Sequence, residues 1–131
     1  MKYLLTIYAD ESHWTEASPE DVQRMMAAYG ALGEAMQKAG VLLGGEGLQP
    51  SSTATTVAVR DGETITTDGP FAETREQLGG YYLIDCKDLD EAIGWAAGIP
   101  DAQHGKVEVR PVMNYEAMGA EEAHTATEGT R

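Results

Sequence analysis

Apolar residues in the first forty positions follow one strand pattern and one helix pattern. Lys2–Ala9 carries apolar or aromatic residues on both faces, which is typical of a central strand covered on two sides. Ser18 is a favourable N-cap, Pro19 suits the first helical position, and apolar residues then recur at helical spacing until Gly40. We therefore expect a strand, a polar loop and a long helix whose methionines, at positions 25, 26 and 36, belong to the core.

The middle of the chain predicts shorter strands. Residues 41–48 are rich in glycine and predict a strand that bends at Gly44-Gly45. Residues 53–60 alternate, and Asp61-Gly62 is a strong two-residue hairpin turn into residues 63–67. Residues 68–77 have neither period and predict an ordered loop, whereas residues 80–86 alternate again as a strand.

The last elements complete an α+β pattern. Asp88 and Glu91 have the spacing of a capping box for a helix that ends near Pro100, and residues 106–112 form the final strand. Residues 1–113 form one domain, and residues 114–131 lack periodicity and predict a disordered acidic tail. This order predicts an antiparallel sheet with two helices on one face, the split βαβ plan.

The other face of that sheet is apolar and aromatic and has no predicted cover. Depending on register, Tyr3 or Tyr8, Tyr81 or Tyr82, and Val112 line it. An open apolar face predicts a partner, most simply a second copy that packs sheet to sheet as a homodimer.

The charge balance limits the classes of partner. The 131 residues include nine Lys and Arg against 22 Asp and Glu, a formal net charge of −13. This argues against binding to nucleic acid or to an anionic membrane. Cys86 is the single cysteine, and no apolar run approaches the roughly 20 residues of a membrane span, so we expect a cytoplasmic protein.

The segment Asp68 to Leu83 reads DGPFAETREQLGGYYL and resembles the signature of the DGPF proteins, a branch of the YCII-related family. The flanking sequences MKYLLTIY, GGEGLQP and VEVRPV resemble other landmarks of that family. The resemblance implies a ferredoxin-like α+β fold of the dimeric α/β-barrel type, with a cleft beside the dimer interface.

The resemblance leaves two functions open. One is a small-molecule binder or enzyme, because some relatives place a His and an Asp together in the cleft. The other is a non-catalytic dimeric accessory or regulatory module with a protein partner, because DGPF members occur beside extracytoplasmic-function sigma factors. Relatives often carry a His in the first helix where this chain has Tyr29, and Arg75 stands where Lys is usual.

Candidate site residues cluster around the signature loop. We interpret Asp68, Glu73 and His104 as candidate catalytic groups, because carboxylates and histidine transfer protons. Further candidates for ligand binding are Tyr8, Phe71, Arg75, Glu76 and Arg110. The structural alternative is that Asp68 caps a turn, Phe71 fills a core gap and Glu73 forms an ion pair.

Other residues favour structural roles. His13 is a structural or surface histidine, and Cys86 is a buried thiol. Glu108 and Arg110 share one strand face, where we expect a cross-strand or intersubunit ion pair in preference to a site for a carboxylate or phosphate. The histidines are scattered, so we expect no metal, and nothing in the sequence indicates a cofactor.

Overall fold

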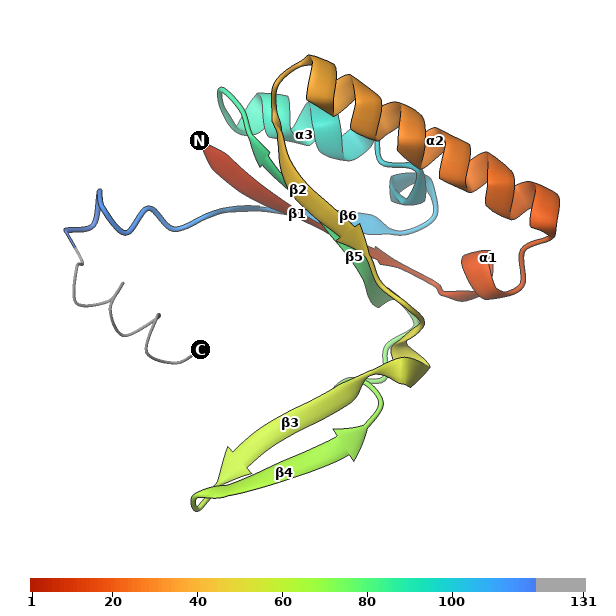
Figure 1. Ribbon diagram of the computed structural model, residues 1–131, viewed down its shortest axis with the longest axis vertical. Helices are drawn as coiled ribbons and strands as arrows, with labels where there is room; N and C mark the ends of the chain where they lie inside the picture. Colours follow the sequence, from red (N-terminus) through yellow and green to blue (C-terminus); the bar gives the residue numbers. More distant parts are fainter. Residues whose placement is uncertain (120–131) are drawn as a thin grey trace.

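The computed structural model describes residues 1–119, which form a sheet with helices on one side and a separate hairpin (Figure 1). In chain order the elements are β1 (Lys2–Ala9), α1 (Ser12–Thr15), α2 (Pro19–Lys38), β2 (Leu42–Gly47), η1 (Ser51–Thr53), β3 (Thr55–Arg60), β4 (Glu63–Asp68), β5 (Gln77–Asp85), α3 (Leu89–Ala97), η2 (Pro100–Gln103) and β6 (Lys106–Pro111). The predicted tail extends beyond the described residues. Its described part, residues 114–119, forms a hydrogen-bonded turn.

The main sheet has the strand order β2-β5-β1-β6, and every neighbouring pair is antiparallel. Both long helices, α2 and α3, cover the same face of this sheet (Figure 1). The elements β1, α2, β2, β5, α3 and β6 therefore make the ferredoxin-like arrangement that the sequence predicts, and the α+β prediction is confirmed.

The core lies between the sheet and the two helices. Along β1, Tyr3, Leu5, Ile7 and Ala9 are buried, while the residues between them are only half-buried or exposed. This alternation resolves the register that the sequence left open. Because residues paired across antiparallel strands share a face, Tyr82, which pairs with Leu5, also faces the helices. The face away from α2 and α3, called the open face below, therefore carries Tyr8 and Tyr81, whereas Tyr3 belongs to the core.

The β3–β4 hairpin, residues 55–68, is a two-stranded sheet of its own and is called the arm below. It extends away from the main sheet, as Figure 1 shows at the lower end of the molecule. Asp61 and Gly62 both have positive φ angles, of 53° and 78°. This is the geometry that a tight two-residue hairpin turn needs, so the predicted turn is confirmed.

Short helical segments and the exposure of Met26 differ from the predictions, whereas the bend in β2 agrees with them. The predicted polar loop before α2 contains the one-turn helix α1, and short 3₁₀ helices flank the arm and β6. Met26, predicted to be in the core, is 63% exposed, because α2 overhangs a pocket at that position. The bend in β2 is present as a register shift between Leu42 and Gly44.

Asp88→Ala is expected to lower the free energy of unfolding by about 1 kcal/mol, because it removes an N-cap. The Asp88 carboxylate accepts the backbone N–H of Glu91 at 2.9 Å, at the start of α3. Asp90→Ala is the matched control, since it removes a first-turn acid that does not cap. Chemical denaturation of both variants checks this, and equal losses would contradict the capping role.

Candidate functional site

A pocket of about 590 Å³ lies under the N-terminal half of α2, on the helix-facing side of the sheet. Its floor includes Ile7 and Ala9 of β1, its roof includes Met26 and Tyr29 of α2, and Asp101 of η2 lines it as well. We call this the Asp101 pocket. Residues of α1, β2 and β5 line it too, so six separate elements supply its walls.

Glycines explain why this part of the sheet is hollow. Gly45 and Gly80 line the pocket, and neither position has room for a side chain. A Cβ on Gly45 would lie 2.8 Å from the Tyr81 carbonyl oxygen, and a Cβ on Gly80 would lie 2.8 Å from the Glu46 carbonyl oxygen. The two strands thus approach closely, and no side chain from these positions fills the space below α2.

Asp101 is a buried carboxylate with only neutral donors. The residue is 6% exposed. Its Oδ2 atom accepts one hydrogen bond from the Tyr29 hydroxyl and a second, at 3.3 Å, from the Trp14 indole N–H. Within residues 1–119, no Lys, Arg or His nitrogen lies within 4 Å of this carboxylate. A buried negative charge without a cation is costly, so the arrangement favours a positively charged guest.

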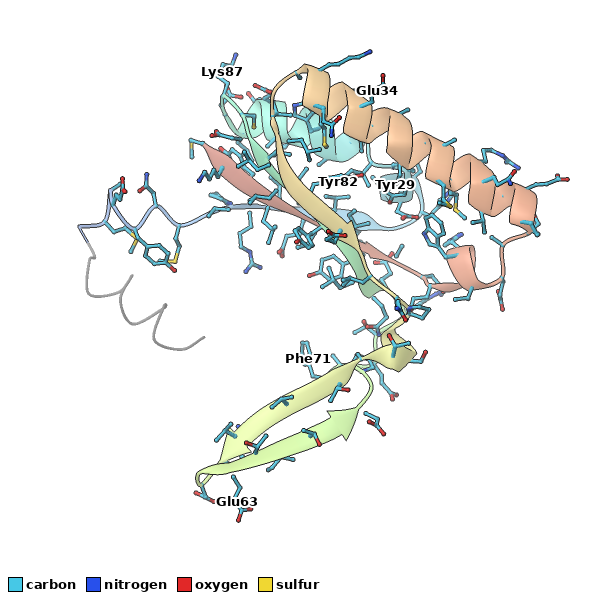
Figure 2. The ribbon with its side chains drawn as sticks, viewed as in Figure 1. Tyr29, Glu34, Glu63, Phe71, Tyr82 and Lys87 are labelled. Carbon is cyan, nitrogen blue, oxygen red and sulfur yellow. The ribbon has the colours of Figure 1, made fainter. Side chains whose placement is uncertain are left out.

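Tyr29 is held in its neutral form. Burial raises the pKa of the Tyr29 hydroxyl well above its ordinary value, and the hydrogen bond to Asp101 and the charge of that carboxylate raise it further. Burial also raises the pKa of Tyr82, which lines the same pocket. Figure 2 shows both rings between α2 and the sheet. The site therefore presents a carboxylate that a neutral hydroxyl already orients by donating to it, and such a carboxylate can accept a cation or a proton from a ligand.

Tyr29→Phe is expected to make the free energy of unfolding less sensitive to alkaline pH. Because the pKa is raised in the folded state, the stabilisation is complete below the ordinary value of 10.0 and is lost as pH rises above it. The ring is only half-buried, so we expect an effect of about 1 kcal/mol at most near pH 11. Chemical denaturation of the wild type and of Tyr29→Phe at pH 8 and pH 11 measures this effect. If both proteins lose the same free energy of unfolding between the two pH values, the account is contradicted.

A pair of stacked histidines joins the elements that hold Trp14 and Asp101. The rings of His13 in α1 and His104 after η2 are 4.6 Å apart between centroids, with an angle of 24° between their planes. The Trp14 and Tyr29 rings are 6.1 Å apart. His13 therefore contacts His104, a contact that its isolated position in the sequence did not indicate.

A second, wider cavity of about 1440 Å³ lies where the open face meets the root of the arm and the loop of residues 69–76. We call it the outer cleft. Two ion pairs tie the loop to the sheet: Arg75 Nε lies 3.5 Å from Asp10 Oδ2, and Lys106 Nζ lies 2.7 Å from Glu76 Oε1. The two cavities adjoin at the end of the sheet, since six residues line both: Asp10, Leu48, Gln49, Pro50, Gln77 and Leu78.

The structure distributes the predicted site residues unevenly. Five of them line the outer cleft: Tyr8, Phe71, Arg75, Glu76 and His104. Asp68, Glu73 and Arg110 line neither cavity. Asp68 ends β4 at the root of the arm, where it pairs with Thr55, and of the three predicted catalytic groups His104 alone lines the outer cleft. The predicted catalytic group of Asp68, Glu73 and His104 is therefore not brought together at either cavity.

Sequence reasoning missed Asp101 and Trp14 and treated Tyr29 only as the replacement of a histidine. Asp101 is one of 22 acidic residues, and its burial depends on α1 and η2, which the sequence patterns did not predict. The one available signal was its place directly after Pro100, at the border of two elements.

The burial and contacts of Cys86, Arg110 and Phe71 show which of their predicted structural roles the structure supports. Cys86 is buried, and burial followed by the charge of Glu91 raises the pKa of its thiol, as expected for an unreactive cysteine. Arg110 Nη2 lies 2.9 Å from Glu108 Oε1, so these two residues of β6 pair with each other along the strand instead of across strands. Phe71 does not fill a core gap, because it is 91% exposed. Among residues 1–119 no three His, Cys, Asp or Glu residues form a group able to hold a metal ion.

These features define a class: a small α+β protein with a ferredoxin-like sheet and a pocket under its first long helix. The chain belongs to the YCII-related family, since the model of the YCII-related domain matches residues 1–116. It is also 43% identical over 117 residues to "Uncharacterized protein R00369" of Rhizobium meliloti (strain 1021), covering 88% of this chain and 94% of that protein. No helix in residues 1–119 is long and apolar enough to cross a membrane.

Proposed function

We propose that this protein binds a small organic cation in the Asp101 pocket, with the cationic nitrogen of the ligand at the Asp101 carboxylate. The observation that carries the proposal is the side chain of Asp101, a residue that is 6% exposed, whose carboxylate within residues 1–119 accepts side-chain hydrogen bonds from the neutral Tyr29 and Trp14 alone. A ligand ammonium group would supply the missing positive charge.

The rest of the pocket suits the organic part of such a ligand. Its volume of about 590 Å³ lies within the range of small-molecule sites, roughly 300–1,000 Å³. Trp14, Met26 and Tyr82 offer aromatic and thioether surface beside the carboxylate. The aromatic faces favour a cation in addition to the charge of Asp101.

The charge of the whole chain supports the same ligand class. A formal net charge of −13 raises the local concentration of cations and repels anions. The described arginines do not line the Asp101 pocket, so an anionic ligand would meet Asp101 without a compensating guanidinium group.

The same pair of residues is arranged for proton transfer if the bound ligand reacts. Asp101 is the proton acceptor of this proposal, and the Tyr29 hydroxyl, already donating to Asp101, orients that carboxylate. The Trp14 indole N–H donates to the same oxygen, Oδ2.

Thermal unfolding with three matched probes tests the ligand class. We expect phenethylammonium to raise the melting temperature, while phenethyl alcohol gives a smaller shift and phenylacetate gives none. At a concentration of 100 times its Kd, a ligand that binds only the folded state stabilises it by about 2.7 kcal/mol. Equal shifts for all three probes, or the largest shift with phenylacetate, would contradict the proposal.

A further inference from the structure

The Asp101 pocket is lined by acidic residues and by no described basic residue. The acids are Asp10, Glu11, Glu46 and Asp101, and no Lys, Arg or His within residues 1–119 lines the pocket. A single ammonium group at Asp101 would neutralise only one of these charges. A second acid matters for the ligand if its side chain faces the pocket and lacks a cation of its own.

Two of the other acids do not meet that condition. Asp10 Oδ2 lies 3.5 Å from Arg75 Nε, so this carboxylate already has a cation. Glu46 pairs with Tyr81 across β2 and β5, and residues paired in this way share a face. The Glu46 side chain therefore lies on the open face and not under α2. This leaves one candidate, Glu11.

Asp101 offers the ligand an oxygen atom that nothing else uses. Tyr29 and Trp14 both donate to Oδ2, and Oδ1 accepts no hydrogen bond from residues 1–119. In that range Thr6 Oγ1 is the only fully buried side-chain N or O atom without a hydrogen-bond partner, so Oδ1 is open to the pocket. A ligand nitrogen that carries an N–H satisfies this oxygen, whereas a fully alkylated nitrogen does not.

Glu11 is a second carboxylate without a cation. Its Oε2 accepts the Ser51 backbone N–H at 2.7 Å and its Oε1 accepts the Ser51 hydroxyl, so the carboxylate is fixed in place. No Lys, Arg or His nitrogen within residues 1–119 lies within 4 Å of it. Each of its oxygens keeps a lone pair that Ser51 does not use, so the carboxylate can still accept from a ligand ammonium group.

One helical turn connects the two carboxylates. The Glu11 carbonyl accepts the Trp14 backbone N–H at 3.0 Å at the start of α1, and the Trp14 indole donates to Asp101. Ser51, which holds the Glu11 side chain, lines the outer cleft, and Pro50 lines both cavities. The Glu11 carboxylate therefore lies at the mouth of the Asp101 pocket, where the two cavities adjoin, and Asp101 lies inside.

We propose that the ligand of the Asp101 pocket is a diammonium compound, with one cationic nitrogen at Asp101 and the other at Glu11. The alkyl chain between the two nitrogens lies along apolar residues of the junction, Leu48, Pro50 and Leu78. The inference rests on the proposed function and names the ligand class of that site more narrowly. Because one molecule reaches both carboxylates, its second contact is intramolecular, and the gain depends on the length of the chain.

The first test is isothermal titration calorimetry of the full chain with two matched series of probes. One series is the α,ω-diaminoalkanes from propane to octane, and the other is the n-alkylamines of the same lengths. We expect the best diamine to bind at least about tenfold more tightly than its monoamine, and the advantage to pass through a maximum as the chain lengthens. An advantage of only about twofold, which two equivalent ends give without any bridging, would overturn the proposal. An advantage that does not depend on length would overturn it as well.

The second test separates the Glu11 carboxylate from the general negative charge of the chain. Glu11→Gln removes the charge but keeps an oxygen for Ser51, and it should reduce the advantage of the diamine to about twofold. Glu16→Gln is the matched control, since Glu16 is an exposed acid of the same segment that lines neither cavity, and the advantage should persist in it. A diamine advantage that survives in Glu11→Gln, or that falls equally in both variants, would contradict the bridging site.

The same titrations distinguish this inference from the proposed function. If phenethylammonium and the alkylamines bind to the wild type but the diamines gain nothing, the proposed function stands and the diammonium inference fails. If neither phenethylammonium nor any amine of the two series binds, the proposed function fails and the inference fails with it.

Discussion

Asp101→Asn is expected to raise the Kd for phenethylammonium at least about 30-fold, which corresponds to about 2 kcal/mol. The substitution removes the negative charge but keeps a side-chain oxygen in place for the Tyr29 hydroxyl and the Trp14 indole N–H. The unliganded variant should therefore be at least as stable as the wild type, because a buried charge without a cation has been neutralised. Isothermal titration calorimetry and chemical denaturation measure the two effects.

Glu91→Gln is the matched control for that experiment. The Glu91 carboxylate also accepts an indole N–H, from Trp95 at 3.1 Å, but it does not line the Asp101 pocket. Both variants replace an acid that holds a tryptophan by its isosteric amide. Loss of affinity in Asp101→Asn with wild-type affinity in Glu91→Gln would support the assignment, whereas equal losses would point to a general change of net charge.

Gly105→Ala is expected to lower the free energy of unfolding by about 3 kcal/mol or more. A Cβ at this position would lie 1.9 Å from the Tyr8 carbonyl oxygen and 2.8 Å from the Ala9 Cα. Both are backbone atoms of β1, so no side-chain rotation relieves the overlap. The Gly105 N–H also donates to the Asp101 carbonyl at 2.7 Å, so a displaced Gly105 disturbs the turn that carries Asp101.

Gly94→Ala serves as the control for Gly105→Ala. Gly94 lies inside α3, and a Cβ there would meet no atom within 4 Å. Since alanine is favoured over glycine in a helix, this variant should gain about 0.5–1 kcal/mol. Denaturation curves of the two variants are the measurement, and a similar change in both would show that the contact with β1 is not the cause.

The sheet and its two long helices were predictable because their signals are local. Ser18-Pro19 and the apolar period after them predict α2, and Asp61-Gly62 predicts the turn of the arm. The face of β1 that enters the core was not predictable, because Tyr3 and Tyr8 are both aromatic and lie on opposite faces. Only the pairing of β1 with β5 and the position of the helices decide between them.

The candidate site was harder to predict because it depends on distant contacts. Tyr29 and Asp101 are 72 residues apart, and Trp14 and Asp101 are 87 apart, so no local pattern connects them. The signature loop is conspicuous in sequence, yet Gln77 closes it on itself by donating to the Ala72 and Thr74 carbonyls. Much of that motif therefore shapes the loop, and its residues Asp68 and Glu73 lie outside both cavities.

The central claim, that Asp101 receives a cation inside the pocket, is tested most directly by following the two tryptophan indole N–H signals by NMR during a phenethylammonium titration. Trp14 lines the pocket and donates to Asp101, whereas Trp95 donates to Glu91 outside it. The account predicts a saturable shift of the Trp14 signal with little change at Trp95, and no saturable shift of Trp14 in Asp101→Asn. A Trp14 signal that does not respond while phenethylammonium binds, or equal shifts at both tryptophans, would contradict it.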